Sequence, residues 1–262
     1  MSEFCKHKAM VVSGLTLALF FAACDRDDGD MPPPPADGNT AESAQNDTLQ
    51  VDTTAADSTV RLNYLALGDS YTIGTGLPEI SGSFPVQLTA RLDAETNFKV
   101  APVRFIAQNR WTTAKLINAV NNANIDTTYR LVSLLIGVNN QYENRPIDEY
   151  TEQFEILLAR AIELAADEAE RVFVVSIPDY GVTPFAESMN SDTIAAEIDA
   201  FNAMNSTIAA DYGVSYFNIT DISRDAEGVP GMLAPDNLHP SAAQYSLWVD
   251  SFYEQVKSKL ND

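Results

Sequence analysis

Short apolar runs alternate with longer amphipathic segments through the C-terminal part of the chain. The apolar runs, which we expect to be strands, cover residues 61–68, 100–107, 130–138, 171–177 and 214–219. Apolar residues recur at helical spacing over residues 83–95, 112–123, 147–169, 192–212 and 241–260. Several runs are apolar at consecutive positions, which is typical of strands buried on both faces. The alternation therefore predicts one α/β domain, residues 61–262, with a parallel sheet between two layers of helices.

Residues 1–23 have the pattern of a secretory signal peptide. Lys6 and Lys8 precede an apolar run that ends in small residues. The end of this run, "FFAAC", resembles a bacterial lipoprotein signal, in which cleavage leaves Cys24 as a lipid-modified first residue. An ordinary secretory peptide, in which Cys24 has no such role, is the alternative. The resemblance implies a domain of the cell envelope, lipid-anchored to the outer membrane.

Residues 24–60 are rich in Pro, Asp, Ser, Thr and Ala and contain few large apolar side chains. Such a segment cannot bury enough apolar area to offset its ordering entropy, so we predict a disordered tether. The acidic cluster after Cys24 resembles a signal that sends some bacterial lipoproteins to the cell surface. A merely solvated linker is the alternative, and the sequence leaves open which membrane face displays the domain.

Charge and metal-ligand content narrow the range of functions. The chain has 37 acidic and 16 basic residues, with a net charge of −21 at pH 7. We expect no nucleic-acid partner, because proteins neutralise phosphate backbones with Lys and Arg. Two cysteines and two histidines are too few for a typical zinc site. We therefore expect neither a metal nor another cofactor.

Two of the predicted strands end in motifs with polar side chains. Ser70 in "GDSYTIGTG" follows the first strand directly, and its hydroxyl becomes a nucleophile when a base removes its proton. Asn139 in "LLIGVNNQYENRP" follows the third strand, and its amide can hold a developing oxyanion without titrating. Ligands of open parallel sheets bind at the carboxyl ends of the strands. Each motif alone is also compatible with a turn.

The segment "DNLHPS" contains His239, whose only fellow histidine, His7, lies in the predicted signal peptide. Asp236 precedes His239 by three residues, which is close enough for its carboxylate to reach the ring N–H. That contact would fix the tautomer of the imidazole and stabilise the imidazolium that forms when His239 takes a proton from a serine. Together the three motifs favour nucleophilic catalysis over a packing role for this histidine.

The three motifs resemble, in order and spacing, the conserved blocks of the SGNH or GDSL family of serine hydrolases. The resemblance covers roughly residues 61–260 and implies a flavodoxin-like α/β/α sandwich with a five-stranded parallel sheet. It implies Ser70 as nucleophile, His239 as general base and Asp236 as its orienting acid. The oxyanion hole would consist of the Ser70 N–H, the Asn139 side chain and a backbone N–H from a second-block glycine.

That second block departs from the family pattern. In "FIAQNRWTTAKLI", alignment on "WTT" places Arg110 where the glycine usually stands. The N–H of Arg110 serves as the third oxyanion donor if the turn tolerates a side chain. The guanidinium could instead reach an anionic group of the substrate or face solvent, and the sequence does not decide between these roles. Candidate cleft walls are the aromatic residues Tyr71, Trp111, Tyr142 and Phe185.

We therefore expect a carboxylic ester hydrolase that works through an acyl-serine intermediate. A small ester or acylated glycan with short acyl groups, such as acetylated carbohydrate, is the expected substrate. A lysophospholipase, a thioesterase or an acyltransferase of the same fold is an alternative, as is a non-catalytic surface lipoprotein that binds a glycan or a protein.

Overall fold

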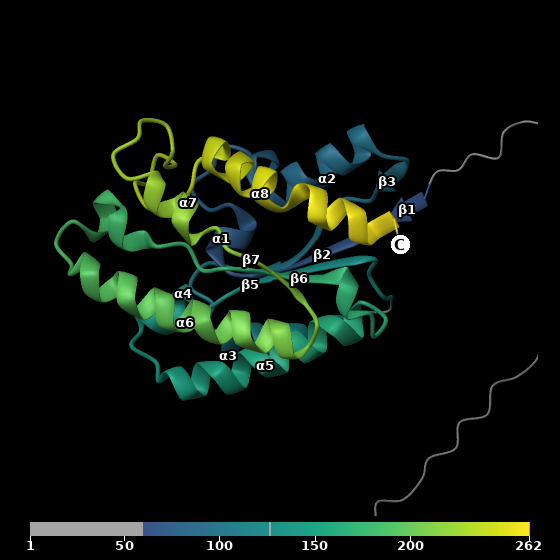
Figure 1. Cartoon of the computed structure of the whole chain (residues 1–262), viewed down its shortest axis with the longest axis horizontal. Helices are drawn as coiled ribbons and strands as arrows, with labels where there is room; N and C mark the ends of the chain where they lie inside the picture. The colour runs from purple at the N-terminus through teal and green to yellow at the C-terminus, as the bar shows by residue number, and fades with distance from the viewer. Residues whose placement is uncertain (1–59, 126, 262) are drawn as a thin grey trace, which may run out of the picture. The chain divides into compact units, whose positions relative to one another are not determined.

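Five parallel strands form the central sheet of the computed structural model, which describes residues 60–125 and 127–261 (Figure 1). The strands are β2 (Tyr64–Gly68), β4 (Arg104–Ala107), β5 (Leu131–Leu135), β6 (Val172–Val175) and β7 (Ser215–Phe217). Their spatial order is β4-β2-β5-β6-β7, so chain order reverses beside β2. This is the flavodoxin-like order. The predicted signal peptide and most of the predicted tether, with Cys24, lie outside the described residues.

A second, two-stranded parallel sheet joins β1 (Val60–Leu62) to β3 (Phe98–Val100). The sequence predicted single strands over 61–68 and 100–107, and each of these is interrupted. Asn63 separates β1 from β2, and its side chain accepts the Arg130 N–H at 2.9 Å and donates to the Thr128 carbonyl at 2.8 Å. Pro102 lies in the second interruption, where it offers no N–H to a sheet.

Helices cover both faces of the sheet. They are α1 (Ser70–Ile73), α2 (Phe84–Glu95), α3 (Thr113–Asn122), α4 (Val138–Tyr142), α5 (Ile147–Leu164), α6 (Ser191–Asp211), α7 (Thr220–Asp225) and α8 (Ala242–Asn261). Single 3₁₀ turns form η1 (Ile80–Gly82), η2 (Ala169–Arg171), η3 (Tyr180–Val182) and η4 (Pro184–Ala186). Helices α3, α5 and α6 lie on one face, and α2 and α8 lie on the other (Figure 1). The expected three-layer α/β/α sandwich is therefore confirmed.

Helix α5 ends earlier than the expected limit at residue 169. Ala166 and Asp167 adopt φ angles of +62° and +61°. Left-handed backbone cannot continue a right-handed helix, so α5 ends at Leu164. The apolar spacing continues past this point, which is why the pattern predicted a longer helix.

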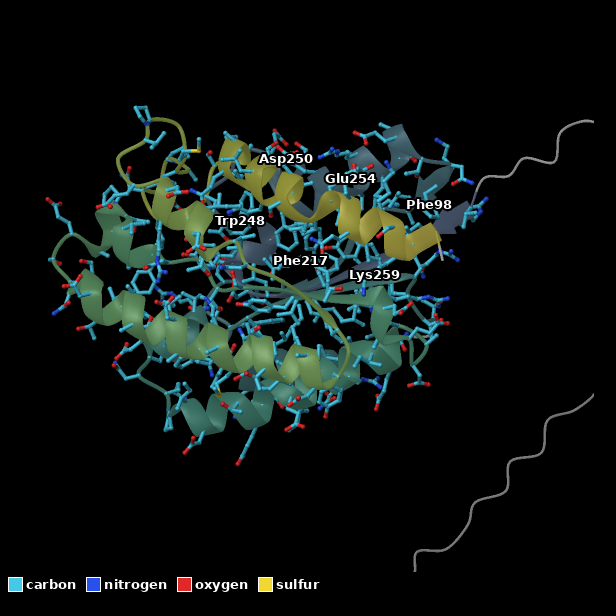
Figure 2. All side chains as sticks on the ribbon, viewed as in Figure 1. Phe98, Phe217, Trp248, Asp250, Glu254 and Lys259 are labelled. Carbon is cyan, nitrogen blue, oxygen red and sulfur yellow. The ribbon has the colours of Figure 1, made fainter. Side chains whose placement is uncertain are left out.

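The last helix, α8, buries its apolar face against α2 and the sheet. Trp248 and Phe252 are fully buried, and the Phe252 ring stacks on Phe217 of β7 with centroids 5.2 Å apart. Asp250 and Glu254 lie on the solvent side, where their side chains are 59% and 72% exposed (Figure 2). Among the described residues, no helix is long and apolar enough to cross a bilayer.

Candidate active site

Ser70 occupies the first position of α1, and only Asp69 separates it from the end of β2. Asp69 caps the helix by accepting the Tyr71 N–H at 3.0 Å, and Gly74 ends it with a φ of +75°. A Cβ at Gly68 would overlap Thr72 and the Leu135 carbonyl of β5, so only glycine fits between this turn and the neighbouring strand. These contacts hold Ser70 at the carboxyl edge of the sheet, as expected from its position after the strand.

His239 and Asp236 form a close pair in the loop before α8. The Nδ1 atom of His239 lies 2.7 Å from Oδ2 of Asp236, and the other carboxylate oxygen accepts the N–H groups of Leu238 and His239. Burial by itself raises the pKa of Asp236, but the hydrogen bonds from His239 and Leu238 outweigh it and the pKa is lowered. Asp236 therefore stays ionised beside the imidazole.

Backbone contacts close the loop that carries this pair. The Ala234 N–H donates to the His239 carbonyl at 2.8 Å, and Leu233 and Pro240 form an antiparallel bridge. Asn237, between the two functional residues, has a φ of +59°. Its carbonyl accepts the Phe185 N–H at 3.3 Å, which links the loop to the segment after β6. The His–Asp geometry is thus held from both sides.

A glycine from the first motif lies directly against this loop. Gly76 has a φ of +84°, and a Cβ at that position would overlap Oδ2 of Asp236. The Tyr71 ring contacts the His239 ring, with centroids 5.1 Å apart. The segment after Ser70 therefore touches both the acid and the imidazole.

Asn139 and Arg110 come from the ends of different strands of the sheet. Asn139 is in α4, and one of its Nδ2 hydrogens is donated to the Trp111 carbonyl at 3.0 Å. The second N–H has no such partner among the described residues. Arg110 has a φ of +62°, so an arginine holds the left-handed conformation that favours glycine. The turn thus tolerates the side chain, which was the condition for its N–H to act as a donor.

Ser70, Arg110, Asn139 and His239 line one pocket of about 440 Å³. The other lining residues are Tyr71, Asn109, Val138, Tyr142, Glu143, Tyr180, Phe185 and Leu238. Of the expected wall residues, Trp111 is not in this set, because its side chain packs partly buried against the core. The structure thus brings the predicted site residues together, with Asp236 behind His239. Their catalytic roles stay predictions.

The sequence did not identify the aromatic group Tyr142–Tyr180–Phe185 as a unit. The three rings lie 6.0–6.3 Å apart, and Tyr142 and Phe185 are 50% and 41% exposed. Tyr180 and Phe185 lie in the segment after β6, whereas Tyr142 is the last residue of α4, so no sequence spacing could have joined them. Burial raises the pKa of the Tyr180 hydroxyl above its ordinary value.

Asp69 is a strongly perturbed carboxyl beside the pocket. Its side chain is fully buried, and burial raises its pKa to about 7, despite the Tyr71 N–H that favours the charged form. Its Oδ2 atom has no hydrogen-bond partner among the described residues. Residues 60–125 and 127–261 contain no group of His, Cys, Asp or Glu side chains that could hold a metal ion.

A serine, a histidine and an aspartate at the carboxyl edge of a parallel sheet are typical of serine hydrolases. A model of the GDSL-like Lipase/Acylhydrolase family matches residues 66–247. The chain therefore belongs to this family and is a carboxylic ester hydrolase of the SGNH/GDSL type. Comparison with curated proteins finds no significant match.

Several solved structures have the same fold. TesA shares 18% identity at a TM-score of 0.58, over 75% of this chain and 99% of that chain. The psychrotrophic esterase EstA from Pseudoalteromonas sp. shares 17% identity at a TM-score of 0.56, and the match covers 77% of this chain and 100% of that chain. Axe2, an acetylxylan esterase from Geobacillus stearothermophilus, shares 20% identity at a TM-score of 0.57, and the match covers 74% of this chain and 94% of that chain. At these identities the likeness shows the fold.

Proposed function

We propose that the protein hydrolyses short-chain carboxylic esters, such as acetylated carbohydrate, through an acyl intermediate on Ser70. The observation that carries the proposal is the 2.7 Å contact between His239 and Asp236, at the pocket that Ser70 lines. A binding protein needs no oriented acid–base pair at its site. A serine nucleophile does need one, because its hydroxyl must lose a proton.

The first step forms the acyl-enzyme. Ser70 Oγ attacks the ester carbonyl while His239 Nε2 accepts the hydroxyl proton, and Asp236 stabilises the resulting imidazolium. When the tetrahedral intermediate collapses, the ester C–O bond breaks and His239 returns the proton to the leaving alkoxide. Water then attacks the acyl-serine with the same base, releasing the carboxylic acid and restoring the Ser70 hydroxyl.

Three donors would hold the tetrahedral oxygen: the N–H groups of Ser70 and Arg110 and the free amide N–H of Asn139. The Asn139 amide is already fixed by its bond to the Trp111 carbonyl, so little reorganisation accompanies the reaction. A neutral amide also keeps its donor at every pH where the enzyme folds. We place the Arg110 N–H in this role because its backbone has the conformation that glycine favours.

Kinetic assays with nitrophenyl esters test the proposal. Ser70→Ala should hydrolyse 4-nitrophenyl acetate no faster than background, whereas Asn139→Ala should lose about 100- to 1000-fold and stay measurable. A series of acetyl, butyryl and octanoyl esters should show a preference for acetyl. Equal rates for Ser70→Ala and wild type would refute the mechanism, and a preference for octanoyl would favour a lysophospholipase or thioesterase.

Two further outcomes would point to a different function. Transfer of the acetyl group to an added sugar faster than to water would identify an acyltransferase. Absence of any esterase or transferase activity in a folded protein, combined with glycan or protein binding, would favour a surface binding protein. The sandwich resembles that of Axe2, an acetylxylan esterase, and this supports testing acetylated polysaccharides first.

We also propose that Cys24 carries the lipid that anchors the protein to the outer membrane. The support is the sequence pattern that ends at this cysteine. Wild type should partition into the detergent phase and the membrane fraction, and Cys24→Ala should not. Equal partitioning of the two proteins would contradict lipid attachment at this residue.

A further inference from the structure

Arg110 lines the same pocket as Ser70 and His239. The residue is exposed and follows β4 at the carboxyl edge of the sheet. Among the described residues that line the pocket, its guanidinium is the only fixed positive charge. The acidic residue on that wall, Glu143, lies 3.6 Å from Lys115 and is therefore partly neutralised.

The loop that carries Arg110 is anchored on both sides. Thr75, in the segment after Ser70, donates its hydroxyl to the Asn109 side chain. The Trp111 carbonyl accepts from Asn139, and the Arg110 carbonyl accepts from Lys115 at 2.9 Å. These contacts fix the backbone of Arg110 relative to the nucleophile loop and the oxyanion asparagine. A preorganised backbone lowers the entropy lost when the guanidinium binds a ligand.

Most arginines of this acidic chain have partners. Of the described arginines, those at positions 91, 104, 130, 145, 160, 171 and 224 donate to carboxylate, carbonyl or hydroxyl oxygens. The guanidinium groups of Arg61 and Arg110 make no hydrogen bond or ion pair with another described residue. Arg61 is in β1, outside the five-stranded sheet and the pocket. Among the described arginines, Arg110 is therefore the one that lines the pocket and has no partner for its guanidinium.

We propose that Arg110 binds an anionic oxygen group of the substrate, so that esters carrying a carboxylate near the scissile bond are preferred. The inference rests on the proposed esterase function and names its substrate class, acylated acidic sugars in particular. A guanidinium matches a carboxylate through two parallel N–H donors. The exposed rings of Tyr142 and Phe185 on the same pocket offer apolar faces for the body of such a molecule. A net charge of −21 repels anions, and a cation at the pocket offsets this repulsion locally.

The test compares charged and neutral esters of matched shape. The first pair is 3-carboxy-4-nitrophenyl acetate and 4-nitrophenyl acetate, with the charge on the leaving group. The second pair is 4-nitrophenyl hydrogen adipate and 4-nitrophenyl hexanoate, with the charge on the acyl group. The readout is the ratio of kcat/KM within each pair, so that differences in intrinsic reactivity cancel between variants.

Arg110→Gly removes the guanidinium and suits the φ of +62°, so the variant should fold. It should lower the charged-to-neutral ratio about tenfold for one of the pairs, in line with the loss of a charge-assisted contact. Arg110→Lys should keep most of the preference. Arg145→Gln, which removes an exposed arginine outside the pocket, should leave both ratios unchanged.

Added salt gives a second readout. Raising ionic strength to about 0.5 M should reduce the anion preference of wild type but not the ratio of Arg110→Gly. Unchanged ratios in Arg110→Gly for both pairs would overturn the inference while hydrolysis of the neutral esters leaves the esterase function standing. If wild type instead hydrolyses the neutral esters no faster than Ser70→Ala, the esterase function itself fails and this inference fails with it.

Discussion

At the scale of single residues, Gly76 makes room for the carboxylate that orients His239. Gly76→Ala would push a methyl group into Oδ2 of Asp236 and should lower kcat/KM at least tenfold. Gly213→Ala is the matched control, because Gly213 has a similar φ of +68° but nothing within 4 Å. Both variants should lose about 1–2 kcal/mol of stability from backbone strain. Equal kcat/KM values for the two variants would contradict the role given to Gly76.

Asp69 should make stability depend on pH. Burial raises its pKa to about 7, so between about pH 4 and pH 7 the folded state binds a proton that the unfolded state has released. The contribution of Asp69 to the free energy of unfolding therefore falls as the pH rises from about 4 to 7 and is constant above that range. In Asp69→Asn the amide oxygen can still accept the Tyr71 N–H, and this loss of stability with rising pH should disappear.

Urea unfolding at several pH values measures this effect. The free energy of unfolding of Asp69→Asn, relative to wild type, should rise by a few kcal/mol from pH 4 to pH 7 and then stay constant. Asp211→Asn, an exposed change on α6, serves as the control and should show no such rise. A pH-independent difference between Asp69→Asn and wild type would contradict a raised pKa.

At the scale of elements, α5 supports the turn that leads to Asn139. The Tyr150 hydroxyl lies 3.0 Å from the Ile136 carbonyl and 2.6 Å from Oδ1 of Asn205 in α6. A Cβ at Gly137 would come within 2.7 Å of this hydroxyl, so the helix packs directly beneath the turn. The Tyr150 hydroxyl thus joins the end of β5 to helices α5 and α6, which lie on the same face of the sheet.

Tyr150→Phe should therefore destabilise the protein by about 1–3 kcal/mol, because it leaves buried polar groups unpaired. Tyr212→Phe removes a hydroxyl that pairs with the exposed Glu155 and should cost less than about 1 kcal/mol. Thermal unfolding of both variants gives the comparison. A Tyr150→Phe protein as stable as Tyr212→Phe would show that this buried contact contributes little.

The elements also show what apolar spacing can predict. Helices α2, α3, α6 and α8 begin and end within one residue of the ranges expected from the sequence. The interruption at Asn63 and the end of α5 were not predictable in the same way. The Asn63 side chain, at the interruption, binds a loop more than 60 residues away, and Ala166 takes a left-handed conformation without a glycine at that position.

At the scale of the whole molecule, the site is assembled from four segments that are distant in sequence. The sequence predicted that Ser70, Asn139 and His239 would meet, because motifs at the ends of parallel strands share one edge of the sheet. It could not predict which loops touch. The contacts of Gly76 with Asp236 and of Thr75 with Asn109 depend on how the strands are ordered and how far each loop reaches.

Covalent labelling of the serine nucleophile tests the central claim most directly. Wild type, Ser70→Ala and His239→Ala would be treated with a fluorophosphonate, and adduct formation followed by intact mass and peptide mapping. We expect one adduct on Ser70 in wild type, none on that peptide in Ser70→Ala, and labelling at least about 100-fold slower in His239→Ala. Modification of a different serine, or an undiminished rate in His239→Ala, would contradict activation of Ser70 by His239.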